Sequence, residues 1–194
     1  MNGFHCHHKF NGPKGVGALY IRRGVMPLNF LDGGAQERGR RAGTENVPYI
    51  VGLGKACELA GRFMQEERVR VSALRDKLEQ GLLEAIPNAI VNGDVEHRLF
   101  NTSSIAFEAV EGEALLLMMD QFGICASSGS ACTSGSLEPS HVLRAMGVPF
   151  TYAHGSIRFS LSRYTTQADI DTVLEVFPPI VKNLREISPF TRRG

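Results

Sequence analysis

The sequence predicts an α/β fold in which helices pack on a small, largely antiparallel sheet. Two observations carry this prediction. Between Gln65 and Ala85, apolar residues recur at spacings of three and four with charged residues between them, which is typical of an amphipathic helix. Between Ser156 and Arg163, apolar and polar residues alternate, which is typical of a strand with one buried face.

The first part of the chain is rich in glycine and turn residues. Residues 11–15 have turn chemistry, and the run from Ala18 to Ile21 is strand-like. A helical pattern starts at Val47, and Cys57 falls within its apolar periodicity, so we expect Cys57 in the core. We place a domain boundary near Arg62, which divides the chain into residues 1–61 and 62–194.

Beyond the long helix, which Pro87 ends, the sequence predicts two short strands, a helix and a further strand. The strands are expected near Ala89–Val91 and Ser103–Phe107, and a short buried helix is expected over Glu113–Phe122, with Gly123 as its stop. Cys125 is then expected to lie in a strand and to be structural.

The last third of the chain carries clear helix signals. Ser140 is a predicted cap for a helix over 141–146 that Gly147 terminates. Thr166 and Asp169 form a capping-box variant that opens the final helix. Pro178 and Pro179 are expected to bend or break that helix.

The composition excludes several classes of protein. A chain of 194 residues with a net charge of +1 suits one domain or a little more, and it gives no sign of nucleic-acid or membrane-surface binding. No apolar run approaches the ~20 residues of a spanning helix. Its 4 cysteines show neither a paired framework nor a CxxC spacing, so we expect a reducing cytosol and a cytoplasmic protein.

The tract from Ile124 to His141 places one thiol, Cys132, among serine, glycine, alanine and threonine. Such a tract lacks the bulk to build a core, so a surface loop is expected. The thiol is unusual there, because a free cysteine is usually a small buried hydrophobe. The chemistry alone leaves two readings, a tolerated surface thiol or a reactive one.

Two other segments invite a binding interpretation. The run of glycine and lysine over 11–17 resembles a phosphate loop but lacks Gly-x4-Gly-Lys-Ser/Thr. The cluster His5, Cys6, His7 and His8 could hold a soft divalent metal, although no second ligand cluster follows. The arginine- and glycine-rich segment 33–44 suits anion binding by backbone N–H groups, or it is a solvated charged loop before a helix.

Four long motifs taken together resemble the cysteine desulfurases, the NifS/IscS group of aminotransferase-like pyridoxal-phosphate (PLP) enzymes. They are HHKFNGPKGVGALYIRRG, GGAQERGRRAGTENVPYIVGLG, SSGSACTSGSLEPSHVLRAMG and AHGSIRFSLSRYT. The resemblance covers essentially the whole chain, and its downstream half looks closest to the nitrogen-fixation NifS branch. It implies the C-terminal small domain of a fold-type I PLP-dependent transferase, plus a remnant of the large domain.

The resemblance also implies site residues for the cofactor. Lys9 is implied to form the Schiff base with PLP, although by itself it would be an ordinary surface lysine. His8 is implied to contact the cofactor phosphate. Cys6 stands where the family usually has a phosphate-contacting serine, and a thiol is a poorer hydrogen-bond donor. Thr44 is implied to reach the phosphate of the partner subunit, which implies a homodimer.

For the substrate, L-cysteine, the resemblance implies two residues. Arg158 would hold the carboxylate, for which a planar guanidinium is suited. Cys132 would be the nucleophile that takes the sulfur as a persulfide and passes it to an iron–sulfur scaffold protein, where it could also contact cluster iron. Catalytic roles thus fall on Cys132 and Lys9.

The family members carry roughly two hundred residues before the Schiff-base lysine, as the resemblance implies, so we expect this chain to be a C-terminal piece. Residues 1–61 would be a remnant of the large PLP-binding domain, and residues 62–194 the small domain with the cysteine loop. The alternatives are a non-catalytic fragment that carries persulfide or serves as a dimer partner, and, less favoured, a selenocysteine lyase.

Overall fold

The computed structural model describes residues 4–6, 10–128 and 140–188, and of residues 4–6 the backbone alone. The chain forms two compact units, residues 1–65 and 66–194. Helix α1 (Val47–Ala85) starts in the first unit and ends in the second. Lys9, His8 and Cys132 lie outside the described residues.

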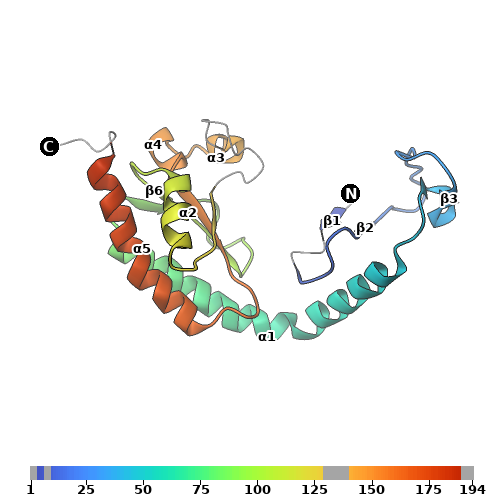
Figure 1. Ribbon diagram of the computed structural model, residues 1–194, viewed down its shortest axis with the longest axis horizontal. Helices are drawn as coiled ribbons and strands as arrows, with labels where there is room; N and C mark the ends of the chain where they lie inside the picture. Colours follow the sequence, from blue (N-terminus) through green and yellow to red (C-terminus); the bar gives the residue numbers. More distant parts are fainter. Residues whose placement is uncertain (1–3, 7–9, 129–139, 189–194) are drawn as a thin grey trace. The chain divides into compact units, whose positions relative to one another are not determined.

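The first unit consists of two small hairpins and the beginning of α1 (Figure 1). Strand β1 (Phe4–Cys6) pairs with β2 (Gly17–Leu19), which is the strand expected near residue 18, and Cys6 stands opposite Gly17. Strand β3 (Ala35–Gln36) pairs with β4 (Arg41–Ala42) across the short 3-10 helix η2 (Glu37–Gly39).

Apolar side chains of the first unit are largely uncovered. Among its described residues only Ala56 is buried, whereas Leu28 and Phe30 are 97% and 96% exposed. Cys57 is exposed as well, so its expected place in a core is wrong. Apolar periodicity identifies a face that can be buried, but burial needs a second element to pack on it.

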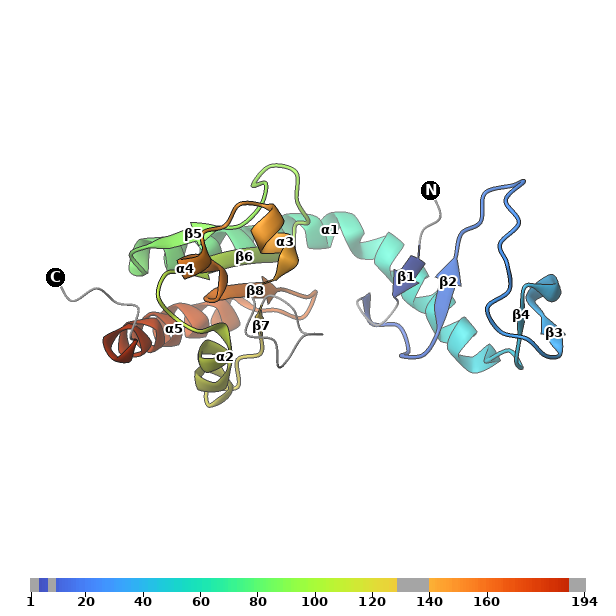
Figure 2. The same cartoon turned by 90° about the horizontal axis from the view of Figure 1, so that it is seen from above.

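The second unit is built on a four-stranded antiparallel sheet, as predicted. Its strands are β5 (Ala89–Val91), β6 (Thr102–Phe107), β7 (Ser127–Ser128) and β8 (Ser156–Ser160), in the order β5-β6-β8-β7. Figure 2 shows α1 and the final helix, α5 (Gln167–Ile187), running alongside this sheet.

The core lies between one face of the sheet and these two helices. In β8 the alternation holds as predicted, with Ile157 and Phe159 buried and Arg158 exposed between them. Phe177 of α5 packs edge-on against Phe159 and Phe107, with ring centroids 5.7 and 5.0 Å apart. Helix α1 contributes to the core the apolar residues that recur at spacings of three and four, namely Val71, Leu74, Leu78 and Leu82.

Three short helices complete the second unit. In α2 (Gly112–Asp120) Leu115 and Met119 are buried but Leu117 is 71% exposed, so this helix buries one face only. Helix α3 (His141–Ala145) begins as predicted, with Ser140 accepting a hydrogen bond from the Val142 amide. Helix α4 (Phe150–Ala153) follows and contacts β6.

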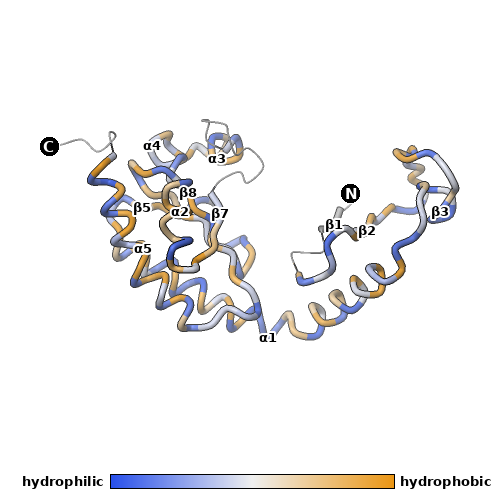
Figure 3. Tube along the Cα trace, in the orientation of Figure 1, coloured by the Kyte–Doolittle hydropathy of each residue, from blue (hydrophilic) through white to orange (hydrophobic). Residues whose placement is uncertain are grey.

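Helix α5 begins at the predicted capping box, in which Thr166 and Asp169 each accept a backbone hydrogen bond from the other. The sequence predicted a bend or a break at Pro178 and Pro179. The helix does not break there and continues to Ile187. Phe177 and Ile180, on either side of the prolines, are buried, and this packing offsets the lost backbone hydrogen bonds. Figure 3 shows the alternation of apolar and polar residues along the helix.

Within the described part of the chain, no helix combines the length and apolar character needed to cross a membrane.

Candidate functional site

A row of four polar residues crosses the sheet of the second unit on the face opposite the core. Arg158 of β8 stands opposite Ser104 of β6 on one side and opposite Ser127 of β7 on the other. Asn92 extends the row beyond β5, since its backbone N–H donates to the Ser104 carbonyl at 2.8 Å. Residues opposite one another on antiparallel strands share a face, so this row forms one polar surface.

Arg158 is the charged member of this row. Its side chain is exposed, and no described residue forms a hydrogen bond or ion pair with its guanidinium. Both cross-strand neighbours are serines, so no carboxylate in the row neutralises its charge. An unpaired guanidinium between two hydroxyl groups is suited to bind a carboxylate or another planar anion at two points.

A hydrogen-bond network supports the row from the β5 side. Asn92 Nδ2 donates to Ser104 Oγ at 3.2 Å and to Ser156 Oγ at 3.3 Å, and Ser156 Oγ donates to the Tyr152 carbonyl at 3.4 Å. The sequence analysis did not single out Asn92 or Ser104. The strand sequence TSSIAF has no polar/apolar alternation that marks Ser104, so both residues join the row only through strand pairing.

Strand β7, which precedes the segment that contains Cys132 in the sequence, pairs with β8 beside Arg158. Ser128, the last described residue before that segment, stands opposite Ile157. Space is tight next to this point, because a Cβ at Gly112 would lie 3.0 Å from both the Ser128 Cβ and the His154 carbonyl oxygen. Cys132 follows Ser128 by four residues, a span of about 14 Å at full extension.

Thr44, the predicted phosphate contact, is exposed in the first unit, between β4 and α1. It follows Gly43, whose φ of +91° is a left-handed conformation that favours glycine. Arg41 braces the segment by donating to the Gly43 and Ala42 carbonyls at 2.5 and 3.0 Å. The hydroxyl of Thr44 is therefore presented by a locally organised turn.

The other predicted residues are placed only in part. Cys6 has its backbone in β1, and Lys9 and His8 lie outside the described residues. Among the residues that the structure describes, no group of three or more His, Cys, Asp or Glu side chains could hold a metal. The search does not cover the side chains of His5, Cys6, His7, His8 and Cys132, which lie outside the described part of the structure.

Cys125 differs from its prediction. It precedes β7 and is exposed, so it is neither in a strand nor buried. The strand pairing of β7 begins only at Ser127, so residue 125 has no partner on β8 and lies in the segment that connects α2 to β7.

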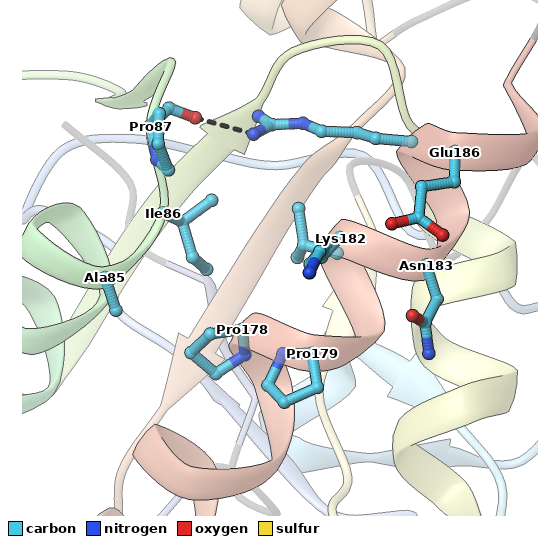
Figure 4. Close-up of a pocket in the computed structure, with 10 residues that line it drawn as sticks. Ala85, Ile86, Pro87, Pro178, Pro179, Lys182, Asn183 and Glu186 are labelled. Carbon is cyan, nitrogen blue, oxygen red and sulfur yellow. Dashed lines mark hydrogen bonds between the residues drawn. The ribbon is translucent and has the colours of Figure 1, made fainter.

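An apolar groove of about 690 Å³ separates the end of α1 from α5. Its lining includes Ile86, Pro178, Pro179, Lys182 and Glu186 (Figure 4), and Arg185, which also lines it, donates to the Pro87 carbonyl at 2.7 Å. None of the predicted site residues lines this groove.

The fold and the polar row define an α/β domain with an arginine on the exposed face of its sheet. The chain matches the aminotransferase class-V family over residues 4–173. It therefore belongs to the aminotransferase class-V family, and the resemblance noted in the sequence is confirmed. Membership implies PLP as the family's cofactor.

Similar proteins point to one branch of that family. The chain is 67% identical to a cysteine desulfurase of Gluconacetobacter diazotrophicus over 94% of its length, and 61% identical to the cysteine desulfurase NifS of Azotobacter vinelandii over 95%. It spans 46% of each of these relatives, about half their length.

Solved structures agree with the predicted fold class. A NifS-like protein superposes with a TM-score of 0.84 and 38% identity, covering 94% of this chain and 47% of that one. A NifS-like protein from Rickettsia africae gives a TM-score of 0.81 and 35% identity, covering 91% of this chain and 46% of the other.

Proposed function

We propose that this chain is part of a PLP-dependent cysteine desulfurase that takes sulfur from L-cysteine and gives L-alanine and an enzyme persulfide. The observation that carries the proposal is Arg158, an exposed guanidinium without a partner among the described residues. It stands one strand away from the beginning of the Cys132 segment. The desulfurase names of the relatives support the same reaction.

Arg158 binds the substrate carboxylate in this proposal. Two N–H groups of the planar guanidinium donate to the two carboxylate oxygens, which fixes the orientation of the amino acid as well as its position. The neutral serines on either side leave the positive charge available for the substrate. This orientation directs the substrate's own thiol rather than its carboxylate toward the reacting groups.

The residues that would hold PLP are Lys9 through its amine and His8, Cys6 and Thr44 near the phosphate. The described donor suits this role, because Thr44 offers an exposed hydroxyl at an organised turn in which Gly43 is left-handed. When bound, PLP acts as an electron sink for bonds broken at the amino acid. Thr44 would serve the partner subunit's cofactor, so the assembly is a homodimer.

Cys132 acts as the sulfur acceptor. Its thiolate forms an S–S bond with the substrate sulfur as the substrate's Cβ–S bond breaks, and the electron pair of that bond stays with the amino acid, which is protonated and leaves as alanine. The persulfide on Cys132 then passes its outer sulfur to an iron–sulfur scaffold protein, and Cys132 contacts cluster iron during that transfer. We place the protein in the cytoplasm, where thiols stay reduced.

The division of the chain into two structural units supports the proposed division into two domains. The unit of residues 1–65 would be the remnant of the large PLP-binding domain, and the unit of residues 66–194 would be the small domain with the cysteine loop. The sequence boundary near Arg62 lies inside α1, a few residues before the division between the units.

The test is made on the whole protein that contains these residues. Arg158→Gln should raise the KM for L-cysteine by about 10- to 100-fold, since a charge-assisted hydrogen-bond pair is lost, while the cofactor absorbance stays unchanged. Lys182→Gln, a charge removal on the exposed side of α5, is the matched control and should leave KM within twofold of wild type. Cys132→Ala should abolish alanine release. Wild-type kinetics in Arg158→Gln or in Cys132→Ala would overturn the proposal.

A further inference from the structure

A second pocket of the 66–194 unit, of about 380 Å³, opens where strand β7 stops pairing with β8. Its wall includes segment 122–125, the end of β8 and the first turn of α5. No member of the polar row around Arg158 lines it. Its volume lies within the roughly 300–1,000 Å³ that is typical of small-molecule sites.

The end of β8 presents to this pocket backbone groups that have no partner among the described residues. The Gly155 carbonyl accepts from Phe107 N and Leu161 N donates to the Asn101 carbonyl, so the odd-numbered residues of β8 bond to β6. Even-numbered residues therefore turn their N–H and C=O groups to the other side. On that side of β8, Arg158 pairs with Ser127 of β7. Ser160 has no strand partner on that side, because residues 124–126 are not in a strand.

The rim of the pocket carries a negative charge. Asp169 Oδ2 accepts from the Thr166 N–H at 2.8 Å and from the Thr166 hydroxyl at 2.9 Å, whereas Oδ1 has no hydrogen-bond partner among the described residues. The hydrogen bond from the Thr166 N–H has the larger effect on the pKa of Asp169, and the one from the Thr166 hydroxyl the smaller. Both lower this pKa below its usual value, so the carboxylate is ionised at neutral pH. It is suited to receive an ammonium group.

The floor of the pocket is apolar. It is formed by buried core side chains, namely Leu78, Phe159, Leu161, Ile170 and Val173. The pocket thus combines a strand-edge donor and acceptor, one ionised carboxylate and a small apolar surface. An amino-terminal dipeptide unit carries the matching groups, which are a peptide N–H and C=O, an ammonium group and short side chains.

We propose that this pocket binds the amino-terminal residues of short peptides. The ligand's ammonium pairs with Asp169 Oδ1, and its second residue pairs with the free backbone groups of Ser160 as an added piece of strand. Its side chains cover the apolar floor. Arg158 does not line the pocket, and the peptide-site proposal does not rest on the desulfurase proposal.

The test uses the ¹⁵N-labelled chain and L-alanyl-L-alaninamide, which has the ammonium and the peptide group but no carboxylate. Titration should produce a saturable shift of the Ser160 amide resonance. N-acetyl-L-alanyl-L-alaninamide, which lacks only the ammonium, should bind at least about tenfold more weakly, because a charge-assisted hydrogen bond is missing.

Asp169→Asn serves as the matched variant, since asparagine retains the side-chain oxygen that caps α5. In this variant the two ligands should bind within twofold of each other. A second variant, Cys125→Phe, fills the pocket from its wall and should abolish the Ser160 shift. No saturable shift at Ser160, or equal binding of the two ligands to the wild-type chain, would overturn the peptide-site proposal and leave the desulfurase proposal standing.

Discussion

Glu79 and Arg98 form a two-point ion pair that joins α1 to the loop before β6. Glu79 Oε2 accepts from Arg98 Nη1 at 2.6 Å, and Oε1 accepts from Nη2 at 2.7 Å. Ser103 Oγ donates to the same carboxylate at 2.5 Å. The two side chains are only 10% and 17% exposed, so the pair is largely withdrawn from water.

Removing one partner of this pair should destabilise the chain. Glu79→Ala leaves the Arg98 guanidinium with an uncompensated charge and Ser103 without its acceptor, so we expect a loss of about 2–4 kcal/mol in the free energy of unfolding. Urea denaturation followed by circular dichroism measures this loss. Glu84→Ala, on an exposed position of the same helix, is the control and should change stability by less than about 0.5 kcal/mol.

The same pair should make stability depend on pH. Burial alone would raise the pKa of Glu79, but hydrogen bonds from Arg98 and Ser103 and the charges of Arg98 and Arg75 outweigh it and leave the pKa below its usual value of 4.5. A lowered carboxyl pKa stabilises the fold above the unfolded pKa, and this contribution is lost as pH falls through the folded one. Wild type should therefore lose more stability between pH 7 and pH 3 than Glu79→Gln does. Equal losses would contradict this assignment.

Gly155 is expected to tolerate no side chain. A Cβ at this position would lie 2.2 Å from the Phe107 carbonyl oxygen and 2.9 Å from a Val110 methyl group. The nearest atom belongs to the backbone, so relieving the clash would require the backbone to move. Gly155→Ala should cost at least about 2 kcal/mol, as overpacked core sites do. The control is Gly61→Ala on α1, where a Cβ meets nothing within 4 Å; it should be neutral or stabilise by up to about 1 kcal/mol. Thermal unfolding compares the two variants.

The thiols of Cys57 and Cys125 should react with a water-soluble disulfide reagent in the native chain, because both residues are exposed. This revises the expectations that Cys57 lies in the core and that Cys125 is structural. Peptide mapping after brief labelling distinguishes the sites, and Cys125→Ser provides the matched blank. Native labelling more than about 100-fold slower than labelling in denaturant would show that these two positions are protected.

The strand and helix patterns of the second unit could be predicted because they are local. The alternation around Arg158 placed Ile157 and Phe159 in the core, and the capping box at Thr166 located the start of α5. Each pattern reflects a repeat of two or 3.6 residues that one element imposes on its own sequence. The family could be recognised for a different reason, since four long motifs occur in the right order.

Burial and strand pairing depend on elements far apart in the chain, and here the sequence was a weaker guide. Cys57 and Cys125 both fit an apolar pattern, yet nothing among the described residues covers them. The polar row unites Asn92, Ser104, Ser127 and Arg158, which are separated by up to 66 positions, only because β5, β6, β8 and β7 pair in that order. By itself the sequence determined the elements, the family and the candidate residues Arg158 and Cys132. The tertiary structure alone decided which faces are covered and which polar groups meet, because these depend on packing between elements and not on the periodicity within one.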